Sequence, residues 1–195
     1  MGRIFRQGSS LAGDFVLRRS KTMSRFKIVA FCVTMALILV LASTALAQEK
    51  IRLSCKFTSA TVKREVIEIG DVEGHYAALR EYEGNFTVTR GPKMMDGALV
   101  SGFSFSDVIL GGGSVHGYGK VVKGPNSFVY KYERGQRHPS TLPDGSPTMK
   151  WEVKLAFIKG TGELEGIQGE CTLRGTYISK YIAVSEGEAE YWIEK

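Results

Sequence analysis

A two-residue alternation of apolar and polar side chains is the feature that most constrains the fold of this chain. It is clearest in residues 149–157, where the apolar positions are Met149, Trp151, Val153, Leu155 and Phe157. A period of two places successive side chains on opposite faces of a β-strand, so this segment predicts a strand with one buried and one wet face. The same alternation predicts strands at 51–58, 127–133 and 170–178, and more weakly at 62–69, 75–83, 85–90, 97–108, 114–123 and 187–194.

Glycine-rich turns separate these segments. Twenty of the 23 glycines follow residue 47, including Gly84 in the predicted turn 83–85. The longest segment without a strand pattern, 135–147, contains three prolines and predicts a loop. After residue 47, no segment of ten or more residues has a helical period. We therefore predict an all-β fold, a single antiparallel closed barrel of about eight strands, with two packed sheets as the alternative.

An unbroken apolar run at 28–47 precedes the alternating segments. It follows Arg25 and Lys27 and ends in the triplet Ala45-Leu46-Ala47, which is the arrangement of a cleaved secretory signal peptide. We predict a signal peptide in residues 1–47, with Met23 as an alternative start, and a barrel domain in residues 48–195. The domain is then exported, to the periplasm or outside the cell. An uncleaved membrane anchor is the alternative, because about 20 apolar residues can span a bilayer.

The formal net charge of +6 belongs to the leader. Seven of the 26 lysines and arginines, and one of the 20 acidic residues, lie in residues 1–47, so 19 basic and 19 acidic residues remain after it. A formally neutral domain lacks the basic excess typical of nucleic-acid binding. We expect no nucleic-acid partner, and membrane contact only through the N-terminal segment if it is not removed.

Two cysteines, Cys55 and Cys171, follow the leader. Both fall on the apolar face of their predicted strands, and an oxidising compartment permits a disulfide between them if these strands are neighbours. We predict this disulfide, with two buried free thiols as the alternative. The spacing of the two cysteines does not fit a zinc site.

No residue cluster predicts catalysis, and we predict no catalytic residue, no metal and no cofactor. The histidines, His75, His116 and His138, do not lie at metal-ligand spacing. The glycines at 111–113 lack the Gly-Lys-Ser/Thr ending of a phosphate-binding loop, and no serine lies in a nucleophile-elbow pattern. A general base formed by His75 or His116 with a carboxylate is the alternative.

A glycine-rich hairpin follows the strand at 151–158, and its sequence from Gly160 to Gly169 is GTGELEGIQG. It resembles the GTGxFxGxxG hairpin of the allene oxide cyclase and dirigent-like barrels, a calycin-type group, over the C-terminal half of the chain only. The resemblance implies a small closed barrel, often with a hydrophobic cavity, and is compatible with a dimer or trimer. The acidic, asparagine-containing N-terminal motif of the cyclases has no counterpart in residues 48–75, so the resemblance transfers no catalytic residue.

Aromatic side chains gather on the faces predicted to point inward. Such a surface either fills a core or lines an apolar pocket with a few polar groups, such as tyrosine hydroxyls. The candidate ligand-binding residues are Phe103, Phe105, Tyr130, Tyr132 and Trp151.

These observations lead to a hypothesis of function with two alternatives. The leading hypothesis is an exported, non-catalytic barrel that binds a small apolar or aromatic molecule or serves as an envelope-associated module. The first alternative is a cofactor-free isomerase or cyclase that acts inside the barrel, as the resemblance would imply. The second is a protein-interaction module that uses the segment 135–147.

Overall fold

The computed structural model describes Ala30, Val33 and residues 49–194. The chain divides into two units, Met1–Ala47 and Gln48–Lys195. Apart from Ala30 and Val33, the predicted signal peptide lies outside the described residues. Among the described residues, no helix has the length and apolar character needed to cross a bilayer.

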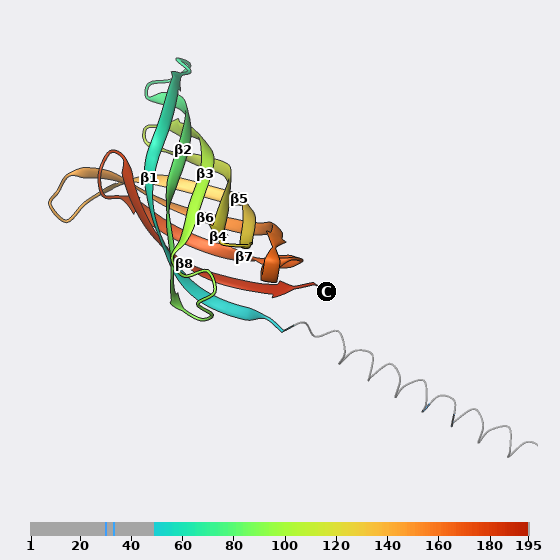
Figure 1. Ribbon diagram of the computed structural model, residues 1–195. Coiled ribbons are helices and arrows are strands. Elements are labelled where there is room, and N and C mark those ends of the chain that lie inside the picture. Colours follow the sequence, from blue (N-terminus) through green and yellow to red (C-terminus); the bar gives the residue numbers. More distant parts are fainter. Residues whose placement is uncertain (1–29, 31–32, 34–48, 195) are drawn as a thin grey trace, which may run out of the picture. The chain divides into compact units, whose positions relative to one another are not determined.

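Residues 51–193 form a closed antiparallel barrel in which each strand pairs with its neighbours in chain order and the last strand pairs with the first (Figure 1). The all-β prediction and the predicted barrel of about eight strands are confirmed. The strands are β1 (Ile51–Glu68), β2 (His75–Arg90), β3 (Ala98–Ile109), β4 (Gly112–Lys123), β5 (Asn126–Thr141), β6 (Pro147–Thr161), β7 (Ile167–Tyr177) and β8 (Ile182–Ile193). One short 3-10 helix, η1 (Gly162–Leu164), lies between β6 and β7.

Two pairs of predicted strands are single long strands. Residues 51–58 and 62–69 join in β1, which has a register shift between Thr61 and Lys63, and residues 75–83 and 85–90 join in β2. The predicted turn at Gly84 is wrong, because this residue pairs with Ser59 inside the sheet. A Cβ atom at Gly84 would overlap the Thr58 carbonyl oxygen, so glycine is needed here for close strand approach rather than for a turn.

The loop predicted at 135–147 is also wrong over most of its length. β5 continues to Thr141 and β6 begins at Pro147, so the two strands form a long hairpin with a short turn at 142–146 (Figure 1). Pro139 pairs with Met149, whereas the pairing of β4 with β5 ends at Arg137. Because one side of β5 is unpaired beyond Arg137, a proline without an N–H donor is tolerated there.

The up-and-down topology gives the barrel two different ends. The turns that follow β1, β3, β5 and β7 lie at one end, which we call the open end. The turns that follow β2, β4 and β6, together with residues 49 and 194, lie at the other, the closed end. The segment 91–97, between β2 and β3, contributes the buried side chain of Met95 to the core at the closed end.

The seam between β1 and β8 closes the barrel. Its register runs from Ile51 opposite Tyr191 to Ala60 opposite Ile182. Ion pairs cross the outside of the seam, with Lys56 Nζ 2.7 Å from Glu186 Oε1 and Arg52 Nε 3.0 Å from Glu190 Oε2. Solvent screens exposed ion pairs of this kind and leaves them little net effect, so closure depends mainly on the backbone ladder and the core.

Candidate binding site in the barrel interior

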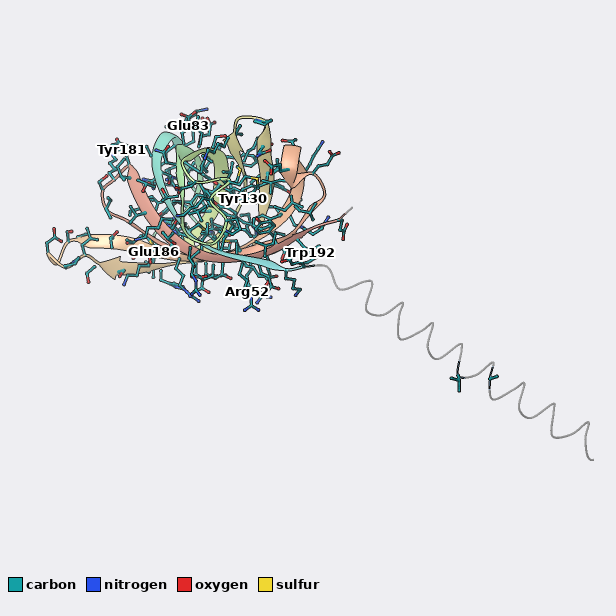
Figure 2. All side chains as sticks on the ribbon, turned by 60° about the horizontal axis from the view of Figure 1, so that its bottom comes forward. Arg52, Glu83, Tyr130, Tyr181, Glu186 and Trp192 are labelled. Carbon is teal, nitrogen blue, oxygen red and sulfur yellow. The ribbon has the colours of Figure 1, made fainter. Side chains whose placement is uncertain are left out.

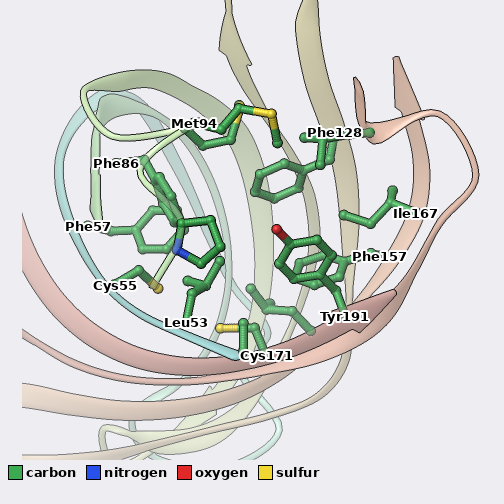
Figure 3. A pocket seen from close by; sticks show the side chains of 15 residues that line it. Leu53, Cys55, Phe57, Phe86, Met94, Phe128, Phe157, Ile167, Cys171 and Tyr191 are labelled. Carbon is green, nitrogen blue, oxygen red and sulfur yellow. The ribbon is translucent and has the colours of Figure 1, made fainter. Parts of the chain in front are cut away.

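The closed end of the barrel is filled by an apolar core to which all eight strands contribute. Figure 3 shows aromatic rings from several strands gathered around a small space, among them Phe57, Phe86, Phe128, Phe157 and Tyr191. Edge-to-face packing joins Phe57 to Phe86 and Phe128 to Phe157, with centroids 4.9 and 5.2 Å apart. The remaining cavity has a volume of about 30 Å³, which is room for about one water molecule. This end is therefore packed core rather than a ligand pocket.

A layer of three tyrosines lies next to this core. The Tyr82 hydroxyl is 3.0 Å from the Tyr130 hydroxyl and 2.9 Å from the Tyr132 hydroxyl, and the rings of Tyr130 and Tyr132 are stacked. In Figure 2 Tyr130 lies inside the barrel, whereas Arg52 and Glu186 lie on its outer surface. Burial raises the pKa of all three tyrosines well above the ordinary value, so they are neutral donors and acceptors of hydrogen bonds.

Inward-facing glycines make room for the large side chains of the interior. A Cβ atom at Gly102 would meet the Tyr82 hydroxyl, and one at Gly119 would overlap the ring of Tyr130. Neither glycine has a positive φ, so the need is for space rather than for an unusual backbone conformation.

The open end contains a cavity of about 470 Å³. This volume falls within the range of roughly 300–1,000 Å³ typical of small-molecule sites. Its wall combines aromatic and aliphatic side chains with hydroxyl groups and basic groups, among them Tyr76, Tyr177, Met149, Ser104, Ser106, Arg64, Arg80, Arg137 and Lys180. A smaller inner space of about 30 Å³, lined also by Tyr132 and Trp151, shares five residues with this cavity and so adjoins it.

Arg80 is held in the wall of this cavity by neutral groups. Its Nε donates to Thr61 Oγ1 at 2.6 Å and its Nη2 donates to Ser59 Oγ at 3.3 Å. The guanidinium carbon lies 5.2 Å from the ring centroid of Tyr82 and 5.1 Å from that of Tyr177. Hydroxyls and aromatic faces therefore orient the guanidinium without neutralising its charge.

Arg137 and Trp151 stand opposite each other on β5 and β6 and line the inner space together. Within residues 49–194, Arg137 Nε and Trp151 Nε1 are buried nitrogen atoms without a hydrogen-bond partner. A Cβ atom at Gly175 of β7 would overlap the Trp151 ring, so this glycine allows the indole to lie flat against the wall. The wall of the inner space thus contains Arg80 together with two residues that each have an unpartnered N–H group.

The five predicted ligand-binding residues divide between the two faces of the wall. Tyr130 is 1% exposed in the interior, and Tyr132 and Trp151 line the space described above. The inward orientation predicted for Phe103 and Phe105 is wrong, because these side chains are 46% and 45% exposed on the outer face of β3. The inward positions of β3 are instead Gly102, Ser104 and Ser106, and at Gly102 the Tyr82 hydroxyl occupies the space that a Cβ atom would need.

The predicted disulfide between Cys55 and Cys171 is not formed. Both side chains point inward and are buried, as predicted, but they are free thiols. β8 lies between β1 and β7, and its register places Gly187 opposite both Cys55 and Leu173. The cysteines are therefore not on adjacent strands, the condition on which the prediction depended.

His75 does meet carboxylates, but away from the cavities of the interior. Its Nδ1 contacts Asp71 and its Nε2 lies 2.8 Å from Asp107 Oδ1, so it joins the turn after β1 to the end of β3. His116 points outward from β4. Within the described part of the chain, no group of three or more His, Cys, Asp and Glu side chains could hold a metal ion.

Sequence reasoning missed the two arginines of the inner space, Arg80 and Arg137. Arg137 lies in the segment predicted as a loop, where no face could be assigned. Arg80 occurs in the series Tyr76, Ala78, Arg80, Tyr82, and a cation on an otherwise apolar face is a signal that could have identified it.

Comparison with protein-family models, with curated proteins and with solved structures finds no match to this chain.

Proposed function

We propose that this protein is exported and that its barrel binds a small apolar or aromatic molecule without catalysing a reaction. The observation that carries the proposal is the open-end cavity of about 470 Å³ with aromatic side chains in its wall. The resemblance of the hairpin 160–169 to the allene oxide cyclase and dirigent-like group supports it, since that group combines a small barrel with a cavity.

The composition of the wall favours binding over the alternative of an isomerase or cyclase. Among the described residues, no histidine, aspartate or glutamate lines the open-end cavity or the inner space. The raised pKa of Tyr132 disfavours the tyrosinate form that a base would need. The wall offers a shape, aromatic surface and hydrogen-bond donors, which are the elements of a binding site.

The test uses native mass spectrometry and a neutral fluorescent probe, N-phenyl-1-naphthylamine. We expect the purified protein to carry a small molecule or to bind the probe, and Ser106→Leu to weaken probe binding at least about tenfold, because Ser106 is buried and lines the cavity. Ser101→Leu is the matched control, since Ser101 is exposed on the outer face of the same strand. The proposal would be contradicted if the purified protein neither carried a bound molecule nor bound the probe.

A specific observation favours self-association as a second candidate function. Phe103, Phe105 and Tyr118 are each about half exposed on the outer faces of β3 and β4, and the rings of Phe103 and Tyr118 are 5.7 Å apart. Exposed apolar clusters commonly mark interaction surfaces. Sedimentation velocity should show a concentration-dependent oligomer that Phe105→Ser dissociates, and a monomer at every concentration would exclude this candidate.

A further inference from the structure

The walls of the open-end cavity carry an excess of positive charge. Four basic residues, Arg64, Arg80, Arg137 and Lys180, line it, and its described lining includes no acidic residue. None of the ion pairs found among residues 49–194 involves any of the four. A guanidinium that is partly withdrawn from water without a counter-charge is unfavourable, so an anionic group in this cavity would be stabilised.

The deepest part of the cavity combines this charge with N–H donors that have no partner. Arg137 Nε and Trp151 Nε1 are both buried and unpartnered, and the residues Arg137 and Trp151 line the inner space with Arg80. A buried donor without an acceptor has lost its hydrogen bonds to water and gained none in return, so the arrangement favours an occupant that brings acceptor oxygens.

The geometry points to a carboxylate as the acceptor. A guanidinium presents several N–H donors in one plane, which matches the two oxygens of a carboxylate, and an indole N–H adds a single further donor. The aromatic rings of Tyr132 and Tyr177 beside these donors suit a flat apolar body attached to the acid.

We propose that the ligand of the open-end cavity is a small aromatic or apolar carboxylic acid, whose carboxylate binds Arg80, Arg137 and the indole N–H of Trp151. This inference rests on the proposed binding function and adds the chemical class of the ligand. The neutral residues Ser104 and Ser106 complete the polar part of the wall.

A matched pair of probes tests the charge. 2-Naphthoate and 2-naphthamide share the same ring system and differ in carrying a carboxylate or a neutral amide. We expect 2-naphthoate to bind the purified protein at least about tenfold more tightly than 2-naphthamide in a fluorescence titration. Arg137→Met should reduce this preference several-fold by weakening 2-naphthoate alone, whereas Arg134→Met, at an exposed position of the same strand, should leave it unchanged.

Trp151 provides a second readout that does not depend on the arginine variants. The chain has two tryptophans, and the other, Trp192, lies next to the carboxyl end of the chain (Figure 2). The indole N–H resonance of Trp151 should shift on addition of 2-naphthoate while that of Trp192 stays in place. Trp151→Phe, which keeps an aromatic ring but loses the N–H, should weaken 2-naphthoate several-fold more than 2-naphthamide.

The outcomes separate the two proposals. Equal affinity for both probes, with the Trp151 resonance shifted by both, overturns the carboxylate inference and leaves the binding function standing. Binding of neither probe overturns the carboxylate inference, and it overturns the binding function as well when N-phenyl-1-naphthylamine also fails to bind and no small molecule co-purifies. A preference for 2-naphthoate that is undiminished in Arg137→Met, in a variant with an unchanged near-ultraviolet spectrum, places the acid elsewhere and overturns the assignment.

Discussion

At the residue scale, the interior is shaped by pairs of very small and very large side chains. Gly102 faces Tyr82, Gly119 faces Tyr130 and Gly175 faces Trp151. Because the aromatic partner occupies the space that a Cβ atom would need, the glycine and the ring must be present together. The tyrosine rings therefore fit into the interior only because glycines lie opposite them.

The first prediction tests this complementarity. Gly119→Ala should lower the free energy of unfolding by about 1–3 kcal/mol, because the added Cβ would overlap the Tyr130 ring. Gly112→Ala is the control on the same strand, since the nearest atom its Cβ would meet outside the adjoining residues is the Arg137 carbonyl oxygen, at 3.6 Å. Urea denaturation measures the free energy of unfolding of both variants. Equal denaturation midpoints would contradict the prediction, because they would show that the interior has space for the added methyl group.

The second prediction concerns His75. Its pKa is raised above 6.5, first by the hydrogen bond with Asp107 and then by that with Asp71. A raised folded-state pKa means that the imidazolium contributes stability fully below pH 6.5 and loses this contribution as the pH rises through the folded pKa. Asp107→Asn should lower the pKa of His75 toward 6.5 in an NMR titration. An unchanged titration midpoint in this variant would show that the contact with Asp107 does not set the pKa.

At the scale of the elements, β3 shows that alternation alone does not say which face is buried. Its hydrophobic residues Phe103 and Phe105 point out, and Ser104 and Ser106 point in. Phenylalanine is more hydrophobic than serine, but Gly102, which lies on the same face of β3 as the two serines, must point inward to leave space for the Tyr82 hydroxyl. This requirement arises from a side chain on another strand, so it is absent from the local pattern.

The third prediction follows from this orientation. Phe105→Ala should change the free energy of unfolding by less than about 1 kcal/mol, whereas Phe128→Ala, in the buried core, should cost about 3–5 kcal/mol. Denaturant unfolding at a concentration where the protein is monomeric compares the same substitution at the two sites. Similar losses at both positions would contradict the outward orientation of β3.

Much of the fold could be predicted from local pattern, and less of the candidate site. The two-residue period identified strands in every part of the barrel and placed Tyr130, Tyr132 and Trp151 in its interior. The strand boundaries predicted near Gly84 and Pro139 were wrong. A glycine can allow close approach of two strands instead of forming a turn, and a proline can occupy an unpaired strand edge. Arg137 could not be assigned to a face once its segment was predicted to be a loop.

At the scale of the whole molecule, the barrel closes without a covalent cross-link. The ladder between β1 and β8 joins the two ends of the sheet, and the two thiols beneath it remain free. Burial of apolar side chains from all eight strands supplies the main stabilisation.

The fourth prediction follows from this mode of closure. A reducing agent should leave the melting temperature unchanged, because there is no bond between Cys55 and Cys171 to break. In the folded protein both thiols should resist a thiol reagent, since each is at most 3% exposed. In denaturant the number of reactive thiols should be the same with and without prior reduction. Two additional thiols after reduction would reveal a disulfide.

Both ends of the barrel's chain segment lie away from the mouth of the cavity. Residue 49 leads into β1, and residue 194 follows β8, at the end opposite the mouth of the cavity. An affinity tag, a fluorescent reporter or a surface tether joined at either position would leave the mouth unobstructed. The barrel could thus be immobilised on a sensor chip through either of these two positions and still admit small molecules from solution.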